Sequence, residues 1–370
     1  MCRRHIIIFV GLLLFPLACV IGGCVGIHNV APVEIAQEQL QPDEDVHVQK
    51  LIELLKGKMQ KDYASGKMMR DAHPKQHGCI KAEFSVEPQL PNELRVGVFK
   101  VARSYPAWIR FSNASGDVQA DTEKDVRGMA IKLMGVSGEK LLEDEKDAQT
   151  QDFILISNPV LPVGTAADFH KLVDASINGH MIRFFFNPFD AHLRELILFA
   201  KAAKQHTNPL DIRYWSTTPY LFGTRAVKYS VRPTSTNISK MPKNPSPDYL
   251  REIMQQQLVI EGASFDFMVQ FQMDQTKMPI EDASIVWDET LAPFHKIATI
   301  TIPPQKFDTE AQMDFGENLS FTPWHSLPDH RPLGNINRVR KEVYRNLSKF
   351  RHTHNDKPHK EPTGAESFNK

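Results

Sequence analysis

The sequence predicts an α+β domain built on an antiparallel sheet or barrel, and three observations lead to that class. Segments with alternating apolar and polar side chains, typical of strands, dominate the middle of the chain. Segments with helical periodicity follow or interrupt them. The last element before a polar tail is also helical, and the chain shows no internal repeat. This order of elements is typical of α+β domains.

The individual elements can be assigned from their side-chain periodicity. Alternation predicts strands at residues 81–87, 107–112, 225–231, 264–272 and 295–303. A period near 3.6 predicts helices at residues 190–205, 249–258 and 338–351.

Composition is that of an ordinary globular protein. The 370 residues are 41% hydrophobic and 24% charged, with a formal net charge of zero. This length suits one large domain or two small ones, and a neutral balance gives no reason to expect nucleic acid as a partner. Three of the four cysteines, Cys2, Cys19 and Cys24, lie near the N-terminus, which leaves Cys79 alone in the body. We therefore expect no internal disulfide.

The two ends of the chain differ from the body. Residues 1–24 combine a short basic start with a long apolar run, as in a signal peptide, a lipoprotein leader or a membrane anchor. Cys24 ends an Ile-Gly-Gly-Cys stretch and is the candidate for lipidation; an uncleaved anchor and ordinary cleavage are the alternatives. Residues 25–45 fit a linker, 46–352 a globular domain and 353–370 a disordered tail. The leader predicts export to the cell envelope or periplasm, with the membrane as a partner.

The closing helix carries an unusual set of side chains. Arg340 and Tyr344 differ by about 40° around the helix axis, and Arg351 lies about 20° from Arg340. The three therefore share one face. They can form a surface stripe in which long side chains extend toward solvent. Alternatively, a guanidinium one turn away favours the phenolate form of tyrosine, which is a hard anionic ligand for ferric iron.

Three blocks of sequence, in order, resemble the catalase superfamily. They are residues 69–86 (MRDAHPKQHGCIKAEFSV), 106–133 (PAWIRFSNASGDVQADTEKDVRGMAIKL) and 321–344 (FTPWHSLPDHRPLGNINRVRKEVY). The chain is most similar to the short, catalase-related bacterial haem proteins, across roughly residues 46–352. The resemblance implies an antiparallel β-barrel with surrounding helices and a haem pocket between the barrel and a C-terminal helix.

The resemblance implies a set of haem ligands. Tyr344 falls at the position of the iron ligand, as a proximal tyrosinate on the ferric iron of haem b, and Arg340 at that of its charge partner. Arg70, Arg110 and Arg351 fall where arginines pair with the haem propionates, whose charges are costly to bury alone.

The resemblance also implies a distal side. His73 would carry the proton during cleavage of the peroxide bond, Ser112 would orient its imidazole, and Phe169 falls where an aromatic ring lies near the haem. Plain core packing is the alternative for Phe169. Ile156 occupies the position of the distal asparagine, so either Asn158 serves in its place or the second distal hydrogen-bonding group is absent.

The remaining expectations concern assembly and activity. The chain is too short for the arm and extra helices of full catalases, so we expect no NADPH and, if it forms a homo-oligomer, a smaller assembly. His77, His325 and His330 match no role and are expected to be structural or at the surface. The predicted function is that of a haem-dependent enzyme of the catalase or peroxidase type, decomposing hydrogen peroxide or organic hydroperoxides as small-molecule substrates. The alternative is a non-catalytic haem-binding or carrier protein of the cell envelope.

Overall fold

The computed structural model describes residues 36–236 and 238–368 of the chain. The predicted leader, with Cys24, and most of the predicted linker lie outside the described residues, so export and anchoring stay predictions from sequence. Within the described ranges, no helix combines the length and apolarity needed to cross a membrane. The described residues all belong to one compact unit.

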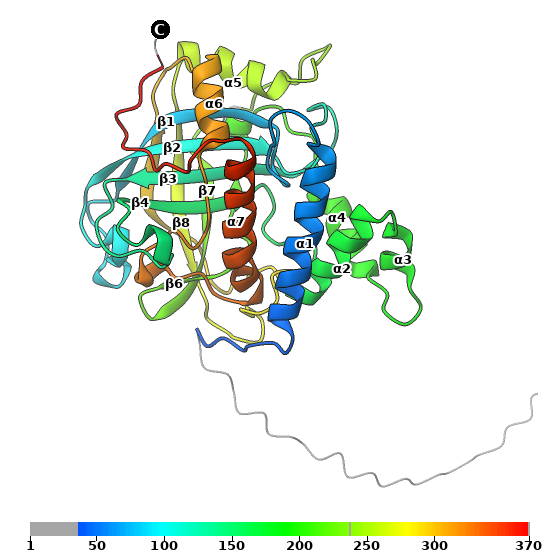
Figure 1. Ribbon diagram of the computed structural model, residues 1–370. Coiled ribbons are helices and arrows are strands. Elements are labelled where there is room, and N and C mark those ends of the chain that lie inside the picture. The colour runs from blue at the N-terminus through cyan, green and yellow to red at the C-terminus, as the bar shows by residue number, and fades with distance from the viewer. Residues whose placement is uncertain (1–35, 237, 369–370) are drawn as a thin grey trace, which may run out of the picture. The chain divides into compact units, whose positions relative to one another are not determined.

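An eight-stranded antiparallel barrel forms the centre of this unit (Figure 1). Its strands, in sequence order, are β1 (Gln76–Val86), β2 (Ser104–Asn113), β3 (Arg127–Met134), β4 (Thr150–Ile156), β5 (Tyr214–Trp215), β7 (Arg225–Pro233), β8 (Ala263–Phe271) and β9 (His295–Ile302). In space they follow the order β5-β4-β3-β2-β1-β9-β8-β7, and pairing of β5 with β7 closes the ring. The short strand β6 (Tyr220–Phe222) extends the sheet beside β7.

The barrel interior is filled by large apolar side chains because alternate residues of each strand point inward. Phe84, Phe153 and Phe267 come from three strands and contact one another, with ring centroids 4.9–6.2 Å apart. The opposite faces of β2, β3 and β4 point outward and carry polar residues such as Arg110 and Lys132, which are nevertheless buried. Something must therefore cover the outside of these strands.

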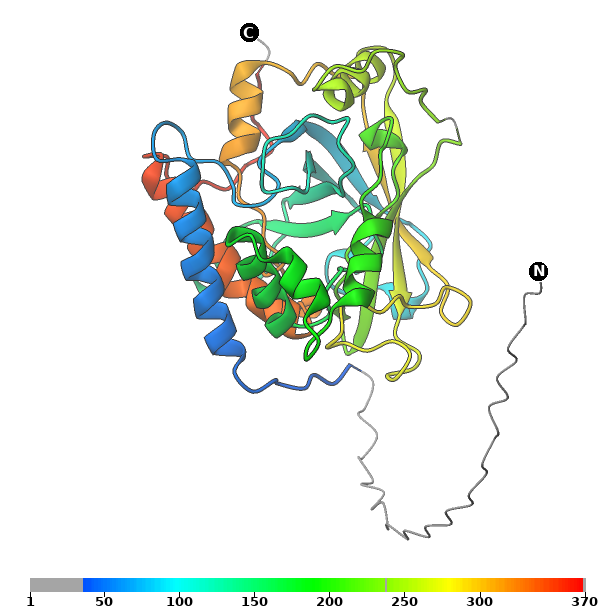
Figure 2. The same ribbon diagram turned by 90° about the vertical axis from the view of Figure 1, so that its right-hand side faces the viewer.

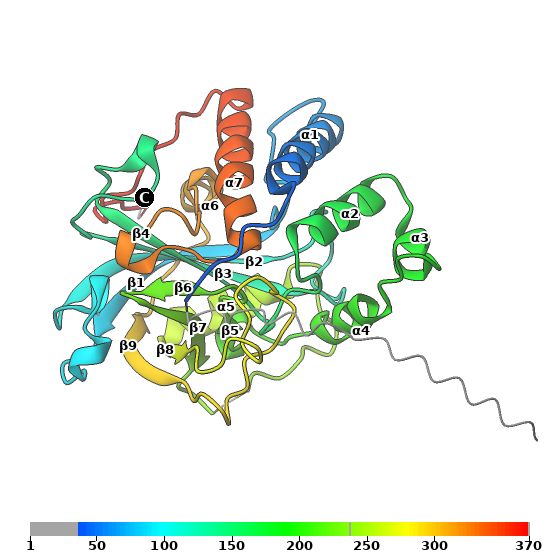
Figure 3. The ribbon, with the colours of Figure 1, turned by 90° about the horizontal axis from the view of Figure 1, so that it is seen from below.

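Helices provide that cover. The helices, in sequence order, are α1 (Glu44–Asp62), α2 (Ala166–Ile177), α3 (Met181–Phe186), α4 (Leu193–Ala202), α5 (Tyr249–Ile260), α6 (Glu310–Asn318) and α7 (Asn335–His354). Figure 1 shows α7 standing across β1–β4, with α1 beside it, and Figure 3 shows the same layering from below. Leu51 and Leu55 of α1 and Val343 and Leu347 of α7 belong to one buried apolar cluster. Helices α2, α3 and α4 lie on the other side of α1 from α7 (Figures 1 and 3). Figure 2 views the molecule from the side on which these three helices lie.

Short 3-10 helices connect several of these elements. They span η1 (Asn92–Leu94), η2 (Gly97–Phe99), η3 (Glu143–Glu145), η4 (Pro209–Asp211) and η5 (Pro328–His330).

Most of the predicted elements are present. The five predicted strands coincide with parts of β1, β2, β7, β8 and β9 and extend at most one residue beyond them, and the predicted helices correspond to α4, α5 and α7. Periodicity did not predict β3–β6, α1–α3 or α6. Strand β3 was missed because its outer side chains include Lys132, which is buried by tertiary contacts and not by its own chemistry.

The C-terminal tail differs from expectation. Its composition predicts disorder, but residues 355–368 follow the outside of the barrel. The Glu361 carboxylate lies 2.8 Å from the Lys132 ammonium, and the Trp108 indole donates a hydrogen bond to Glu366. Phe368 packs against Trp108. Charge pairing with barrel residues therefore holds a segment that has few apolar side chains of its own.

Candidate functional site

The candidate site begins with a row of three residues on the outer face of the barrel. Ser112 of β2 pairs with Gly128 of β3, and Gly128 pairs in turn with Ile156 of β4. Directly paired residues of an antiparallel sheet point to the same face. Ile156 therefore lies two strands from Ser112 on the same face of the sheet.

His73 is held against this row by both its side chain and its backbone. Its Nδ1 lies 2.9 Å from Ser112 Oγ, and its carbonyl accepts a hydrogen bond of 2.9 Å from Arg110. Its φ of 59° places it in the left-handed region, which is uncommon for a residue other than glycine. Such strained conformations persist only where the surrounding contacts impose them, and they cluster at functional sites.

Gly128 makes room for the imidazole. A Cβ atom at this position would lie 2.6 Å from His73 Nδ1 and 2.7 Å from Ser112 Oγ. No side chain fits at that distance without displacing the pair. The row is thus shaped to receive this histidine ring.

His73 is neutral at physiological pH. Burial, followed by the charges of Arg110, Arg70 and Arg340, lowers its pKa to about 3. A neutral imidazole has one protonated and one unprotonated nitrogen, so it can accept a proton.

The three arginines predicted to bind propionates meet at the carboxylate of Glu317, a residue that was not among the predicted site residues. Arg70, Arg110 and Arg351 lie within 2.9, 3.3 and 3.7 Å of carboxylate oxygens of Glu317. Arg70 and Arg351 also donate to the Glu317 carbonyl. Glu317 belongs to α6, and no signal in its local sequence distinguishes it from the exposed carboxylates of the same helix.

This cluster carries more positive than negative charge. Three guanidiniums face the single carboxylate of Glu317, and Arg110 and Arg351 are only 3% and 2% exposed. Burial, followed by the charge of Arg70, lowers the pKa of both Arg110 and Arg351 to about 9. Burial also raises the pKa of the neighbouring Asp71 carboxyl, which disfavours its negative form. Arg110 Nε is buried without a hydrogen-bond partner.

A ligand with two carboxylates fits this cluster. Its carboxylates would balance the positive charge of the arginines and would accept a hydrogen bond from Arg110 Nε. Without such a ligand, buried charges and a buried donor stay unpaired, which is costly. Haem carries two propionates, so the residues present fit that cofactor. Arg70, Arg110 and Arg351 are the residues able to hold its carboxylates.

The proximal candidates lie on α7, beside the residues Val339, Val343 and Leu347 that pack in the cluster shared with α1. Arg340 donates to Thr218 Oγ1 at 3.2 Å and to Asn337 Oδ1 at 3.4 Å, which fixes the guanidinium. Tyr344 is half-buried one turn later. Among the contacts of the described residues, no hydrogen bond joins Arg340 to Tyr344. The sequence analysis did not single out Thr218 and Asn337, which position Arg340.

The two remaining candidates have partners elsewhere. Asn158 donates an amide hydrogen to the Val160 carbonyl at 2.7 Å, and among the described residues no hydrogen bond joins it to His73. Phe169 of α2 packs against the apolar cluster between α1 and α7 and also against the one formed by α2–α4. The structure therefore brings His73, Ser112 and the arginines together and leaves Asn158 outside that group.

Comparisons with known proteins give similarity in structure only. No protein-family model and no curated protein sequence matches the chain. Among solved structures, it is similar to a fungal catalase (TM-score 0.61, 16% identity, covering 80% of this chain and 61% of that one). Catalase A from Saccharomyces cerevisiae gives a TM-score of 0.58 at 15% identity, covering 88% of this chain and 68% of that one. A bacterial catalase gives 0.56 at 14% identity, with coverages of 88% and 64%.

These similarities cover 80–88% of this chain. The chain spans 61% of the fungal catalase and 64% of the bacterial one, so more than a third of each lies outside the match. The eight-stranded antiparallel barrel with its covering helices matches the predicted fold class. The chain therefore has the fold of the catalases.

Proposed function

We propose that the protein binds haem through α7 and the arginine cluster and uses His73 to decompose peroxides. The observation that carries this proposal is the neutral His73 imidazole, held by Ser112 beside the buried arginines. An imidazole that is neutral at pH 7 has one unprotonated nitrogen available for a proton from a substrate. The similarity of fold to catalases supports the same assignment.

Each residue has a defined task in this proposal. His73 would accept a proton from one oxygen of the peroxide and return it to the other, which would leave as water with two electrons supplied by the haem. Ser112 holds the ring nitrogen that faces away from the substrate, so that the imidazole keeps one orientation. Arg70, Arg110 and Arg351 neutralise the propionates. Haem iron, bound through Tyr344, supplies the redox chemistry that amino-acid side chains lack.

A second candidate function is haem binding without useful turnover. The observation that favours it is Ile156, which places an apolar side chain in the row of Ser112 and Gly128. A haem carrier needs Tyr344 and the arginines but no second polar group beside His73. Both functions share the cofactor and differ only in chemistry at the distal side.

The decisive experiment is an absorption spectrum of the purified full-length chain, followed by addition of hydrogen peroxide in an oxygen electrode. A ferric haem spectrum with tyrosinate character and release of oxygen supports a catalase-type enzyme. The same spectrum with oxidation of an added reductant, or consumption of a lipid hydroperoxide, supports peroxidase-type turnover. A haem spectrum that no peroxide changes supports the carrier. Absence of haem after reconstitution contradicts both functions.

Matched variants separate the role of His73 on the distal side of the haem from that of Tyr344 on the proximal side. His73→Gln should reduce turnover roughly 10²–10⁴-fold with haem still bound. His77→Gln is the control, because His77 is also buried with its pKa lowered to about 3 but bonds to Asn113. Tyr344→Phe should instead weaken haem retention. Equal turnover in the His73 and His77 variants would contradict a catalytic role for His73.

Ile156→Asn tests the second candidate function. An amide at this position would add a hydrogen-bonding group to the row of Ser112 and Gly128 that holds His73. Turnover per bound haem should then rise about tenfold. Ile154→Asn, two residues earlier on the same face, is the control.

A further inference from the structure

A second polar cluster lies on the outside of the barrel, away from the candidate haem residues. Two glutamates and two histidines alternate in a closed ring. The Glu145 carboxylate contacts His325 Nδ1 and lies 3.4 Å from His359 Nδ1. The Glu361 carboxylate lies 3.6 Å from His325 Nε2 and 2.9 Å from His359 Nε2. Each carboxylate is thus placed between two imidazoles.

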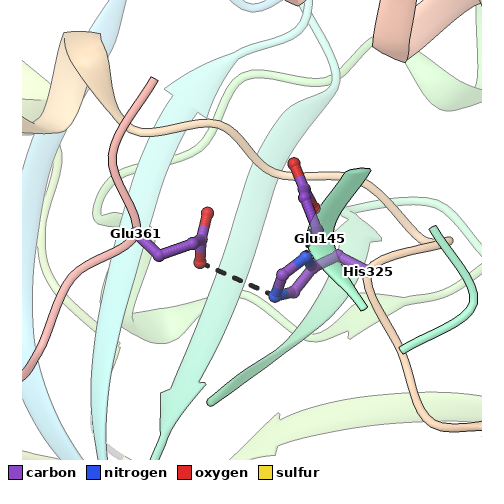
Figure 4. A group of neighbouring side chains, drawn as sticks. All are labelled: Glu145, His325 and Glu361. Carbon is purple, nitrogen blue, oxygen red and sulfur yellow. Dashed lines mark hydrogen bonds and ion pairs between the residues drawn. The ribbon is translucent and has the colours of Figure 1, made fainter. Parts of the chain in front are cut away.

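Figure 4 shows the His325 ring between the carboxylates of Glu145 and Glu361. These three residues can each offer one ligand atom within 4.8 Å of the other two. His325 is fully buried, and the two glutamate side chains are each 19% exposed. The His359 side chain is 29% exposed and lies at the edge of this group, so the site is buried on the His325 side and open on the His359 side.

The four residues come from three separate segments. Glu145 ends η3, His325 lies in the loop between α6 and α7, and His359 and Glu361 belong to the C-terminal tail. Within the described part of the chain, only these segments contribute to the ring. A ligand bound here would therefore tie the tail to the barrel.

Carboxylates outnumber ammonium groups in this cluster. Lys132 of β3 pairs with Asp152 of β4 at 2.7 Å and also contacts Glu361 at 2.8 Å. Glu145, Glu361 and Asp152 thus place three carboxylates around one ammonium, next to the two imidazoles. A divalent cation would add positive charge among these carboxylates and could accept an imidazole lone pair.

We propose that Glu145, His325, His359 and Glu361 form a binding site for a divalent transition-metal ion of the Zn²⁺ type. Two imidazole nitrogens and two carboxylate oxygens match the ligands and the coordination number of a structural zinc site. Imidazole ligands disfavour Mg²⁺ and Ca²⁺, which prefer oxygen ligands alone. Thr150 supports the site, because its Oγ1 lies 2.5 Å from His325 Nε2 and donates to Glu361 at 2.6 Å.

The site has a structural consequence that is independent of haem. A metal ion that binds only the folded chain stabilises it. Because two of the four ligands come from the tail, metal binding closes a link between residue 145 and residue 361. The tail then becomes part of the folded domain and not merely a segment lying on it.

The test is isothermal titration of the metal-free full-length chain with Zn²⁺, followed by thermal unfolding with and without the metal. We expect one Zn²⁺ per chain and, at saturation, a rise in Tm of roughly 3–8 °C. Mg²⁺ should give neither effect. Absence of stoichiometric Zn²⁺ binding would overturn the proposal. The four residues would then form only a network of hydrogen bonds and ion pairs.

Matched variants locate the site. Glu145→Gln and His359→Gln should each weaken Zn²⁺ binding by more than about 100-fold, since loss of a supporting contact alone costs 10–100-fold. Glu143→Gln, on the exposed side of the same 3-10 helix, and His354→Gln, exposed at the end of α7, are the controls and should bind normally. Neither test variant removes a fully buried residue. Binding that survives both test variants would overturn the assignment.

Discussion

Two ends of one sheet face have opposite charge. Toward one end of β2–β4, the row of Ser112, Gly128 and Ile156 lies beside an arginine cluster with a surplus of positive charge. Four residues along β3, about 13 Å away, Lys132 and Asp152 lie in a cluster where three carboxylates surround one ammonium. Arg351 of the arginine cluster belongs to α7, whereas the segments before and after α7 contribute His325 and Glu361 to the acidic cluster.

The difference in charge indicates which kind of ligand each end can bind. A barrel strand offers an outward position at every second residue, so one strand can place side chains of opposite charge in separate clusters. Burying unbalanced charge is costly, and each surplus therefore indicates a ligand of the opposite sign. The arginine end suits the carboxylates of haem, and the acidic end suits a metal cation.

The largest expected effect comes from removing the one carboxylate at the arginine end. Glu317→Gln should lower the free energy of unfolding by about 3–5 kcal/mol in the haem-free protein, because it leaves buried guanidiniums without a counter-charge. Bound haem should reduce that loss, since its propionates supply negative charge. Chemical denaturation of both forms measures this, with Glu310→Gln, exposed on the same helix, as the control. An equal loss with and without haem would show that the arginines do not hold the propionates.

An intermediate effect concerns pH at the same end. The folded chain holds the pKa of His73 at about 3, whereas a histidine in the unfolded chain has a pKa near 6.5. The unfolded state therefore binds one more proton as pH falls from about 6.5 to about 3, and stability declines by up to about 1.4 kcal/mol per pH unit.

His73→Gln should remove this contribution. The free energy of unfolding of the variant should then fall less steeply with falling pH, by up to about 1.4 kcal/mol per pH unit. Unfolding measured at several pH values from 4 to 7 tests it. His77 and His330, whose pKa values are also lowered to about 3 by burial, contribute equally in both proteins. Identical slopes in variant and parent would mean that His73 is protonated normally.

The smallest expected effect is at the acidic end. Burial alone would lower the pKa of Lys132, but Asp152 and Glu361 raise it, so its ammonium stays charged and repels a metal cation. Lys132→Met should tighten Zn²⁺ binding about tenfold, because it removes a like charge in a low-dielectric site. Calorimetric titration measures the change, and Lys146→Met, on the exposed surface after η3, is the control. Weaker binding in the Lys132 variant would contradict the charge argument.

Much of the fold could be predicted from sequence because it depends on local periodicity. The alternation in residues 81–87 and 264–272 and the helical period of residues 338–351 correspond to β1, β8 and α7. Strand β4 and the placement of the tail could not be predicted in this way. Their polar residues, such as Asp152 and Glu361, are buried only because Lys132 and His325 meet them from distant parts of the chain.

The candidate site shows the same division. The sequence by itself determined that Arg340, Tyr344 and Arg351 share a helix face and that Arg110 and Ser112 share a strand face, since backbone periodicity sets both. Only the tertiary structure decided that Glu317 joins three arginines, that Asn158 bonds to Val160, and that His325 lies between two carboxylates. The physical reason is that periodicity fixes directions within one element, whereas charge balance depends on which elements meet.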